Sequence, residues 1–271
     1  MEFATLYHEL GVPVTVIEAM PTILPNLDQE VVQVLLDKYK KAGINILTQT
    51  KVESIDGNTV HYSSLSSEEG RGEVSAERIL VSVGRRANLQ GLEALEGLEL
   101  NRGAIVIDEF CQTNLPKVYA CGDVTGKIML AHVASRQAEV AVEHMLHDQM
   151  VNAQMVNYNA VPSVVYTNPE IASVGLTEVQ AESMEIPVEV RKLPMTFSGR
   201  FMAENEGETG LCKMIVDSRT QTIVGVHCIG NPCSEFIAAA SCAVRNGYTL
   251  SDFQQVVFPH PTVSEILHEL L

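Results

Sequence analysis

The hydrophobic positions in residues 1–82 occur in two patterns, one with the spacing of a helix and one of short apolar runs that are typical of buried strands. Residues 2–10 and 28–42 repeat apolar side chains at helical spacing, and the first helix is expected to end at Gly11, which tolerates the left-handed conformation. Residues 63–78 are polar and rich in turn formers, so a hairpin tip or surface loop is predicted there. Helices that alternate with buried strands indicate βαβ units on a parallel sheet. The strands are predicted at 14–18, 44–47, 52–55, 59–62 and 79–83.

The pattern changes in the second half of the chain. Strands predicted at 104–107 and 118–121 precede a helix at 131–147, and a polar linker follows around 148–155. Beyond the linker, strands cluster between helices instead of alternating with them, which indicates an α+β layer. The segments expected there are strands at 163–166, 188–192, 211–216 and 223–227, and helices from the cap Thr177 to 183, at 234–245, and at the carboxyl end.

A short motif at 258–265 carries candidate acid/base chemistry. Pro261 suits the first turn of a helix because it fixes φ and has no N–H, which places His260 directly before that helix. A histidine there has non-helical dihedrals, so its ring can reach Glu265. A carboxylate that accepts from one imidazole nitrogen fixes the tautomer and raises the basicity of the other. The spacing also leaves open a capping histidine beside a solvated glutamate.

Length and composition narrow the class of protein. The 271 residues suggest about two domains, at roughly 150 residues each, and 46% of them are apolar, enough for a sizeable core. The 18 basic and 34 acidic side chains give a net charge of −16, which repels phosphate backbones and anionic lipid. We therefore expect neither nucleic acid nor a membrane as a partner. The sequence opens without a basic signal-like segment, so a cytoplasmic location is predicted.

The six cysteines fit reduced thiols better than a disulfide scaffold. Cys228 and Cys233 have four residues between them, a spacing that a redox dithiol can use. Cys228 follows a predicted strand and Cys233 opens a predicted helix, so two ordinary buried cysteines are the favoured interpretation. No His/Cys spacing resembles a zinc site, and no metal site is predicted.

The start of the sequence has part of a dinucleotide-binding pattern. Such a unit opens with a strand and a Gly-x-Gly-x-x-Gly turn, continues with a helix, and closes its second strand with an acid that binds ribose. The helix, the second strand and the acid, Glu18, are present here, whereas the first strand and the glycine turn are not. Taken alone, Glu18 is also compatible with an ordinary surface carboxylate.

A second candidate ligand site follows the predicted strand at 118–121. Gly122 lets a ligand approach the backbone, and Asp123 can accept a hydrogen bond from a sugar hydroxyl. The helix predicted from residue 131 can direct its first N–H groups at a phosphate. Arg85 and Arg86 can likewise clamp a phosphate or neutralise nearby acids.

Five motifs occur in a fixed order along the chain. They are VSVGRRAN at 81–88, TNLPKVYACGDVTG at 113–126, LAHVASRQ at 130–137, VPSVVYTNPEIASVGLTE at 161–178 and FPHPTVSE at 258–265. In this order they resemble the flavin-dependent pyridine nucleotide–disulfide oxidoreductases, and within them most of all the dihydrolipoamide dehydrogenases. The resemblance covers nearly the whole chain.

The resemblance implies FAD and NAD as cofactors and gives individual residues a role. Asp123, beside Gly122, would bind the flavin ribityl chain, and Glu18 would bind the ribose of NAD, where a carboxylate disfavours the extra phosphate of NADP. His260 would deprotonate the attacking thiol, with Glu265 orienting the imidazole. The other residues expected near the cofactors are Glu2, Met129, Leu130, Ala131 and His132 for the flavin, and Gly84 for NAD.

The resemblance also implies a fold and an assembly. We expect an α/β protein with an incomplete Rossmann-type NAD domain at 1–82 and a remnant of the FAD domain at 83–152. An α+β interface, or dimerisation, domain is expected at 153–271. In the family this domain forms a two-fold dimer and delivers the His–Glu pair to the partner's flavin, so a homodimer is expected. Components of a 2-oxoacid dehydrogenase complex would be further partners.

The sequence departs from the family pattern at its start. Family members carry a flavin-ADP glycine motif and a Cys-x4-Cys redox disulfide before the NAD domain, and neither has a counterpart here. Cys228 and Cys233 have the spacing of that disulfide, but they lie in a different part of the sequence. We therefore expect a portion of a dihydrolipoamide dehydrogenase that is inactive alone. The alternatives are a non-catalytic dimerisation module, a simple NAD-binding protein, or a glutathione or mercuric reductase. Glu18 argues against an NADPH enzyme, and the absence of a C-terminal cysteine pair argues against mercuric reductase.

Overall fold

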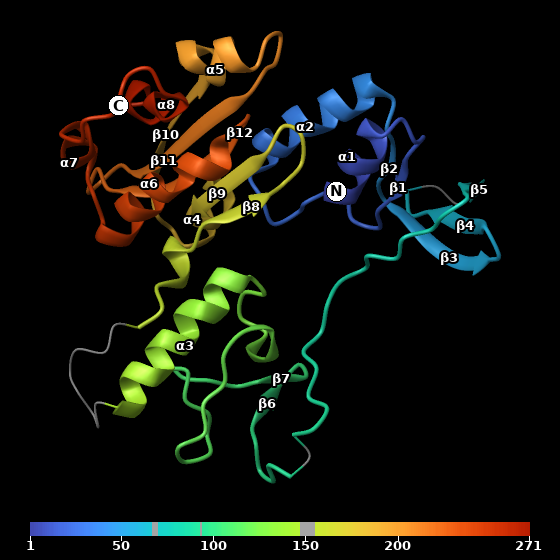
Figure 1. Ribbon diagram of the computed structural model, residues 1–271, viewed down its shortest axis with the longest axis horizontal. Coiled ribbons are helices and arrows are strands. Elements are labelled where there is room, and N and C mark those ends of the chain that lie inside the picture. Colours follow the sequence, from blue (N-terminus) through green and yellow to red (C-terminus); the bar gives the residue numbers. More distant parts are fainter. Residues whose placement is uncertain (67–69, 93, 147–154) are drawn as a thin grey trace. The chain divides into compact units, whose positions relative to one another are not determined.

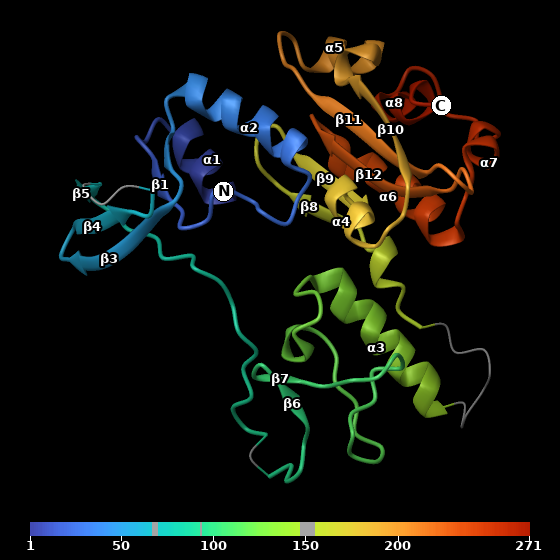
Figure 2. The same cartoon turned by 180° about the vertical axis from the view of Figure 1, so that it is seen from behind.

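The computed structural model describes residues 1–66, 70–92, 94–146 and 155–271. Two compact units are present, one built from residues 1–79 together with 159–271 and the other from residues 80–158 (Figures 1 and 2). Each unit has a hydrophobic core of its own. The division into three functional domains that the sequence suggests stays a prediction.

A short βαβ segment opens the first unit. Its α2 helix begins after Asp28, whose Oδ1 accepts the N–H groups of Glu30 and Val31 at 3.1 and 3.2 Å. The helix ends at Gly43, which has a φ of 90°. This start and stop confirm the helix predicted at 28–42. The elements are α1 (Glu2–Glu9), β1 (Thr15–Ile17), α2 (Gln29–Ala42) and β2 (Asn45–Leu47), with β1 and β2 paired in parallel.

A three-stranded antiparallel sheet follows, with β4 in its centre. The strands are β3 (Thr50–Asp56), β4 (Thr59–Ser64) and β5 (Arg71–Ser75). The loop predicted over 63–78 is therefore wrong where β5 lies. The polar composition of β5 conceals a strand that exists because it pairs with β4. Gly72 lies against the ring of Tyr62, and a Cβ at this position would come within 2.6 Å of the ring.

A five-stranded antiparallel sheet forms the centre of the first unit and confirms the predicted α+β layer. Its order is β10–β11–β12–β9–β8, with bounds β8 (Ser163–Val165), β9 (Ile171–Gly175), β10 (Val188–Pro194), β11 (Leu211–Asp217) and β12 (Ile223–Ile229). The helices are α4 (Glu178–Ser183), α5 (Gly199–Glu204), α6 (Cys233–Asn246), α7 (Leu250–Gln254) and α8 (Ile266–Glu269). Thr177 caps α4 as predicted, in a capping box with Gln180.

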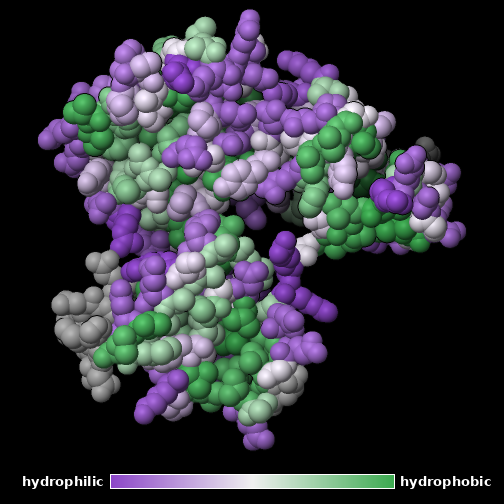
Figure 3. Space-filling model, viewed as in Figure 1, coloured by the Kyte–Doolittle hydropathy of each residue, from purple (hydrophilic) through white to green (hydrophobic). Residues whose placement is uncertain are grey.

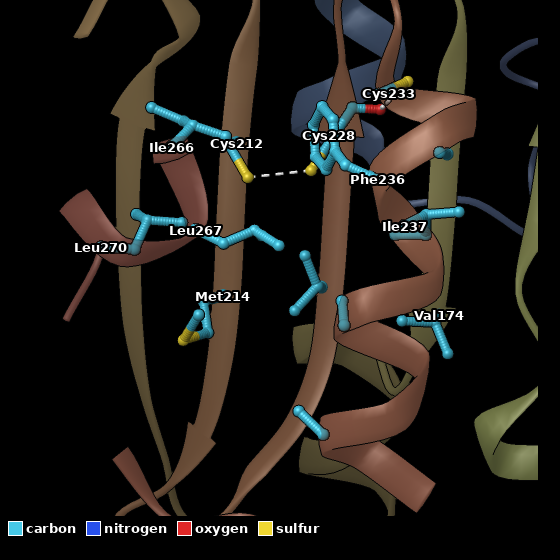
Figure 4. Packing of buried hydrophobic residues seen from close by; sticks show 14 of the residues in the cluster. Val174, Cys212, Met214, Cys228, Cys233, Phe236, Ile237, Ile266, Leu267 and Leu270 are labelled. Atoms are coloured by element: carbon cyan, nitrogen blue, oxygen red, sulfur yellow. Dashed lines mark hydrogen bonds between the residues drawn. The ribbon is translucent and has the colours of Figure 1, made fainter. Parts of the chain in front are cut away.

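The two faces of this sheet pack against different helices. On one face, Cys212 and Met214 of β11 lie in a hydrophobic cluster with side chains of α6 and α8 (Figure 4). The opposite face meets α2, where Ile171 and Ile229 pack in a second cluster with helix side chains such as Leu35. Because successive residues of a strand point to opposite faces, β11 alternates between the two environments.

A charged cluster joins α2 and α4 to the sheet. The Nζ of Lys213, a residue only 3% exposed, donates to Asp28 Oδ2 at 2.9 Å and to Glu30 Oε2 at 3.0 Å, and it also contacts the carboxylate of Glu178. Burial alone would lower the pKa of Lys213, but the hydrogen bonds with these three carboxylates outweigh burial and raise the pKa. We call these four residues the Lys213 cluster.

His227 lies beside this cluster, on β12 directly opposite Lys213. It is 2% exposed, and its Nε2 is 2.9 Å from the carbonyl oxygen of Leu176. Burial lowers the pKa of His227, which keeps the ring neutral. Among the described residues, two buried side-chain atoms have no hydrogen-bond partner, His227 Nδ1 and the Oγ of its cross-strand neighbour Ser173.

The second unit is largely irregular and packs against one side of a single long helix. Its elements are β6 (Leu100–Asn101), β7 (Ala104–Ile105), a 3-10 turn at Asp123–Thr125 and α3 (Ala131–Leu146). Figure 3 shows hydrophobic surface on this unit. Across both units, no described helix is long and apolar enough to cross a membrane.

Two strands predicted in this part of the chain are wrong. Residues 79–83 find no pairing strand among the described residues, and Val83 is 92% exposed. Residues 118–121 form only an isolated bridge between Tyr119 and Gln112. Both segments have the apolar composition of a strand. Residues 79–83 have no hydrogen-bonded neighbour in the described part of the chain, and the pairing of 118–120 with 111–113 ends after this one bridge. The predicted helix end at His147 and most of the linker, 148–154, lie outside the described residues.

The C-terminal helix begins later than predicted. Thr262 is the N-cap of a 3-10 turn at Val263–Glu265, and this turn leads into α8. Pro261 therefore precedes the cap instead of occupying the first turn. The reason is the side chain of Glu265, which accepts the N–H of Thr262 at 2.8 Å and so fixes the start of the turn at that residue.

Candidate active site

His260 and Glu265 form a hydrogen-bonded pair just before α8. Nδ1 of His260 lies 2.9 Å from Oε1 of Glu265, a distance consistent with the reach expected from their spacing. The histidine side chain is 82% exposed and the glutamate side chain 27%. The carboxylate therefore holds one ring nitrogen, while the other, Nε2, belongs to an exposed ring and can exchange a proton with a bound reactant.

A second contact fixes the orientation of Glu265. Its Oε2 accepts the N–H of Thr262, and the hydroxyl of Thr262 donates to the carbonyl oxygen of Pro259 at 2.8 Å. The Thr262 N–H, followed by the hydrogen bond with His260, lowers the pKa of Glu265 below its ordinary value. Glu265 is thus a carboxylate at neutral pH and selects the imidazole tautomer with its proton on Nδ1.

Buried side chains of the C-terminal turn anchor this pair. Ile266 and Leu267 are fully buried in the cluster that also contains α6. The hydroxyl of Ser198 donates to the carbonyl oxygen of Thr262 at 3.2 Å, which ties the loop to the start of α5. The His–Glu pair therefore stands on a rigid support, as an acid/base group requires.

The turn at Gly122 and Asp123 belongs to the second unit. Gly122 has a φ of 81°, and a Cβ there would lie 3.2 Å from the Cβ of Ala134, so the turn packs directly on α3. Its N–H donates to Oε1 of Gln137 at 2.6 Å, and Nε2 of Gln137 donates to the hydroxyl of Tyr158 at 2.9 Å. This packing leaves the Asp123 side chain exposed.

Gln137 is a residue that the sequence analysis did not single out. It is fully buried, and its position in the LAHVASRQ motif gives no sign of which group it contacts. One signal was present in the sequence: an amide side chain on the apolar stripe of a helix needs a buried partner.

The start of α3 supplies the other residues expected near a flavin. Met129 and Leu130 are half-buried, while Ala131 and His132 are exposed in the first turn of the helix. An exposed carboxylate at Asp123, a backbone turn without a Cβ and an exposed helix start are suitable for a sugar–phosphate cofactor. Gly84 lies in an exposed irregular segment of the same unit, with a φ of 120°.

Glu18 and Glu2 each accept a hydrogen bond from the backbone. Glu18 follows β1 directly, and its Oε1 accepts the N–H of Met20 at 2.8 Å. Oε1 of Glu2 accepts the N–H of Tyr166 at 2.9 Å, which ties α1 to the end of β8. No described contact joins either carboxylate to His260 or Glu265. In the ranges that the structure describes, no group of three or more His, Cys, Asp and Glu side chains has the arrangement of a metal site.

The chain thus combines a nucleotide-type α/β segment, a glycine–aspartate turn and a five-stranded antiparallel sheet. A family model for pyridine nucleotide-disulphide oxidoreductases matches residues 1–138, and the model for the dimerisation domain of that family matches residues 161–271. The chain belongs to the pyridine nucleotide-disulphide oxidoreductase family. This confirms the family and the mixed α/β fold that the motifs predict.

Curated relatives carry the name dihydrolipoyl dehydrogenase. The protein of this name from Thermus scotoductus is 38% identical over 276 residues, and the one from Chlamydia pneumoniae is 36% identical over 270 residues. Each alignment covers 99% of this chain but only 58% and 57% of the respective relative. The chain therefore spans somewhat more than half the length of these relatives.

Solved structures likewise match nearly the whole of this chain with only part of their own length. LpdA from Mycobacterium tuberculosis matches with a TM-score of 0.88 at 27% identity, and the flavoprotein disulfide reductase RclA from Escherichia coli matches with a TM-score of 0.85 at 26% identity. Both matches cover 99% of this chain, and they cover 58% and 61% of those chains.

Proposed function

We propose that this chain is part of a flavin- and NAD-dependent dihydrolipoyl dehydrogenase, in which it provides the acid/base pair and the dimer interface. The observation that carries the proposal is the hydrogen bond between His260 Nδ1 and Glu265 Oε1, on the segment that matches the dimerisation domain. The names of the curated relatives support the substrate.

In the proposed reaction, His260 takes a proton from a thiol of dihydrolipoamide. Only the thiolate is a competent nucleophile in thiol–disulfide exchange, so a base is needed near neutral pH. With Nδ1–H directed at Glu265, Nε2 is the nitrogen that accepts the proton. The ionised Glu265 then stabilises the imidazolium that forms. FAD and NAD supply the electron acceptors of the overall reaction.

The residues present are suitable for both cofactors. For FAD we propose Gly122 and Asp123 at the ribityl chain and residues 129–132 beside the ring system. For NAD we propose Glu18 of the first unit at the adenosine ribose, and we propose Gly84 of the second unit as a further residue near NAD. Glu18 Oε1 already accepts the N–H of Met20, which orients the carboxylate and leaves Oε2 to accept from a ribose hydroxyl.

A homodimer is part of this proposal. The ring of His260 is 82% exposed, and an acid/base group is effective only where a second surface excludes water around the reactant. A second copy related by a two-fold axis would provide such a surface. Components of a 2-oxoacid dehydrogenase complex are the proposed partners of the whole enzyme.

The isolated chain is expected to be a dimer. It should also be colourless and unable to turn over dihydrolipoamide, because its sequence has no Gly-x-Gly-x-x-Gly turn and no redox Cys-x4-Cys pair before Glu18. Absorbance spectroscopy, analytical ultracentrifugation and an NADH assay measure the three properties. Turnover by this chain alone would show that the redox dithiol is not required and would contradict the proposal.

The acid/base role is tested in a hybrid enzyme. The part of the Thermus scotoductus relative that this chain does not match is fused in front of Met1, and dihydrolipoamide oxidation is measured. His260→Gln should lower kcat by about 10²–10⁴-fold, the usual contribution of a general base. His268→Gln, an exposed histidine of α8, is the matched control and should leave kcat unchanged. A hybrid that binds both cofactors and keeps its kcat after His260→Gln would rule out the role.

A non-catalytic dimerisation module is the second candidate. The contact of Glu2 favours this candidate. Glu2 is expected near the flavin, but its Oε1 accepts a hydrogen bond from the backbone N–H of Tyr166, so this residue has a structural role within the first unit. A dimer without bound flavin is expected for the isolated chain under both candidates, so the hybrid decides: a correctly folded hybrid that binds neither FAD nor NAD and has no turnover would support the module.

A further inference from the structure

Two cysteines of the central sheet face each other across neighbouring strands. Cys212 of β11 is paired directly with Cys228 of β12, and both residues are fully buried. Their Sγ atoms are 2.8 Å apart (Figure 4, dashed line). From the sequence Cys228 is predicted as an ordinary buried residue, and no spacing there indicates a contact with Cys212.

The third buried thiol of this region is not part of the pair. Sγ of Cys233, at the start of α6, lies 3.3 Å from the carbonyl oxygen of Glu170 and 3.9 Å from the carbonyl oxygen of Cys228. The cysteines with four residues between them, Cys228 and Cys233, thus have no contact between their sulfur atoms among the described interactions. The sulfur partner of Cys228 comes from the neighbouring strand.

The distance between the two sulfur atoms distinguishes a metal site from a disulfide. Two thiolates bound to a tetrahedral zinc ion, with zinc–sulfur bonds of about 2.3 Å, are about 3.8 Å apart, well beyond the observed contact. A disulfide needs an approach to about 2.05 Å, with Cα atoms about 4.4–6.8 Å apart. Directly opposed residues of antiparallel strands have Cα atoms about 4.5–5.5 Å apart, which lies within that range. The geometry therefore favours a covalent bond over a metal.

We propose that Cys212 and Cys228 are a latent oxidation site, at which a peroxide converts the two thiols into a cross-strand disulfide. One thiolate attacks a peroxide oxygen, the O–O bond breaks, and a sulfenic acid and one water form. The second thiol attacks the sulfenic sulfur, the S–O bond breaks, and a second water leaves as the S–S bond forms. The two thiols lose two electrons, and hydrogen peroxide gains them as it becomes two waters.

Burial keeps this site unreactive in the closed protein. Burial raises the pKa of the Cys228 thiol well above its ordinary value, so the thiolate is scarce. The surrounding cluster of α6 and α8 side chains also excludes peroxide (Figure 4). Oxidation should therefore occur when the hairpin of β11 and β12 opens, and the exposed Cys121 and Cys242 should react first.

The bond would lock the centre of the five-stranded sheet. It would join residues 16 positions apart in the chain, across the hairpin of β11 and β12. Lys213, the cation of the Lys213 cluster, lies on β11 next to Cys212. A loop of this length restricts the unfolded chain appreciably, so the oxidised protein should have a higher Tm, by about 5 °C or more. The site requires neither flavin nor NAD, so the inference is independent of the proposed function.

The test uses the full chain with Cys121→Ser and Cys242→Ser, which removes the two exposed thiols. The protein is treated with hydrogen peroxide in buffer and in urea below the unfolding midpoint, free thiols are alkylated under denaturing conditions, and linked peptides are identified by mass spectrometry. The expected result is a Cys212–Cys228 link that forms much faster in urea than in buffer, together with a Tm rise that dithiothreitol reverses.

Two further variants make the outcome decisive. Cys233→Ala should retain the link, whereas Cys212→Ala should abolish it without producing a Cys228–Cys233 link. A predominant Cys228–Cys233 link, or Cys212 and Cys228 recovered as separate sulfinic acids, would overturn the inference. Because the double-serine protein itself is mapped, the result does not depend on the folding of Cys212→Ala.

Discussion

At the scale of single residues, Glu265 uses its two carboxylate oxygens for different partners. Oε1 faces the ring of His260, and Oε2 accepts the backbone N–H of Thr262. The backbone contact is the larger cause of the lowered pKa of the carboxyl group. The acid is therefore ionised and oriented by the main chain before the imidazole takes part, and such preorganisation is the purpose of a supporting contact.

This order of causes can be measured in the isolated chain. In a carbon-13 NMR titration, the Glu265 carboxyl should titrate below the ordinary glutamate pKa of about 4.3. His260→Ala should leave part of this shift in place, because the hydrogen bond from the Thr262 N–H, its largest single cause, remains. His61→Ala serves as the control, because His61 lies on β4 beside Glu73 and is not among the causes of the Glu265 shift. A return of Glu265 to the ordinary value in His260→Ala would mean that the ring, and not the backbone, lowers the pKa.

Gln137 determines the conformation of a different candidate site residue. Gln137→Leu should leave the N–H of Gly122 without its acceptor, which costs about 1–3 kcal/mol for a buried group. Hydrogen exchange at Gly122 should become correspondingly faster, and Gln137→Glu should keep the protection because its Oε atoms still accept. Glu143→Gln, an exposed position on the same helix, is the control. Unchanged exchange in Gln137→Leu would show that the turn holds without the amide.

At the scale of elements, α2 is attached to the sheet by charge as well as by apolar contacts. Asp28 caps α2 with Oδ1 and accepts from Lys213 with Oδ2, so one carboxylate serves the helix and the sheet together. Lys213 is almost fully buried, and its ammonium group is surrounded by acids instead of water. A buried pair of this kind becomes costly when one partner is removed.

Lys213→Met is therefore expected to destabilise the first unit by about 3–5 kcal/mol, because Asp28 remains as a buried, uncompensated carboxylate. Adding Asp28→Asn should recover much of the loss, since asparagine still caps α2 and carries no charge. Urea unfolding of the two single variants and the double variant measures the coupling.

Lys192→Met is the matched control for this cycle. Lys192 also contacts Glu30, but its side chain is 51% exposed, so its loss should cost about 1 kcal/mol or less. Equal effects of the Lys192 and Lys213 variants would mean that burial does not strengthen the cluster.

Elements with strong local signals are predictable from the sequence, and those that depend on a partner are not. The α2 helix follows from its periodicity, its cap Asp28 and its stop Gly43. Residues 79–83 have the composition of a strand but find no pairing strand among the residues that the structure describes, whereas β5 has a polar composition and pairs with β4. Strand formation depends on pairing, which composition does not report.

The same limit applies to the candidate site. The contact of His260 with Glu265 lies within the reach of a five-residue separation, so the sequence indicates it. The contact of Gln137 with Gly122 depends on how α3 packs on the turn, and the Lys213 cluster depends on how α2 meets the sheet. These are tertiary distances that no spacing in the sequence contains.

At the scale of the whole molecule, buried histidine links stability to pH. His227 has a lowered pKa in the folded state, mainly through burial, with Lys213 acting in the same direction and Asp28 and Glu178 opposing it. Above the unfolded pKa of about 6.5, the ring is neutral in both states and contributes no pH dependence. Below this pH, the unfolded chain binds a proton that the folded chain refuses, so stability falls.

We expect the free energy of unfolding to decrease below about pH 6.5, with a slope of up to about 1.4 kcal/mol per pH unit from this one group. His227→Gln, which retains a donor for the Leu176 carbonyl oxygen, should flatten the curve between about pH 5 and 6.5. His268→Gln should preserve the slope because His268 is exposed. Urea unfolding as a function of pH is the measurement, and an unchanged slope in His227→Gln would contradict the assignment.

The alternation along β11 has a consequence for how the molecule reaches its fold. A mispaired hairpin, displaced by a single position, would turn the ammonium group of Lys213 toward the hydrocarbon side chains of α6 and α8 and would set Cys212 among the carboxylates. The first change buries an ammonium group in hydrocarbon, and the second leaves the carboxylates without their cation, so slipped arrangements lie well above the native one in free energy. The register of β11 in the five-stranded sheet is thus fixed by the difference in polarity between two successive residues, Cys212 and Lys213.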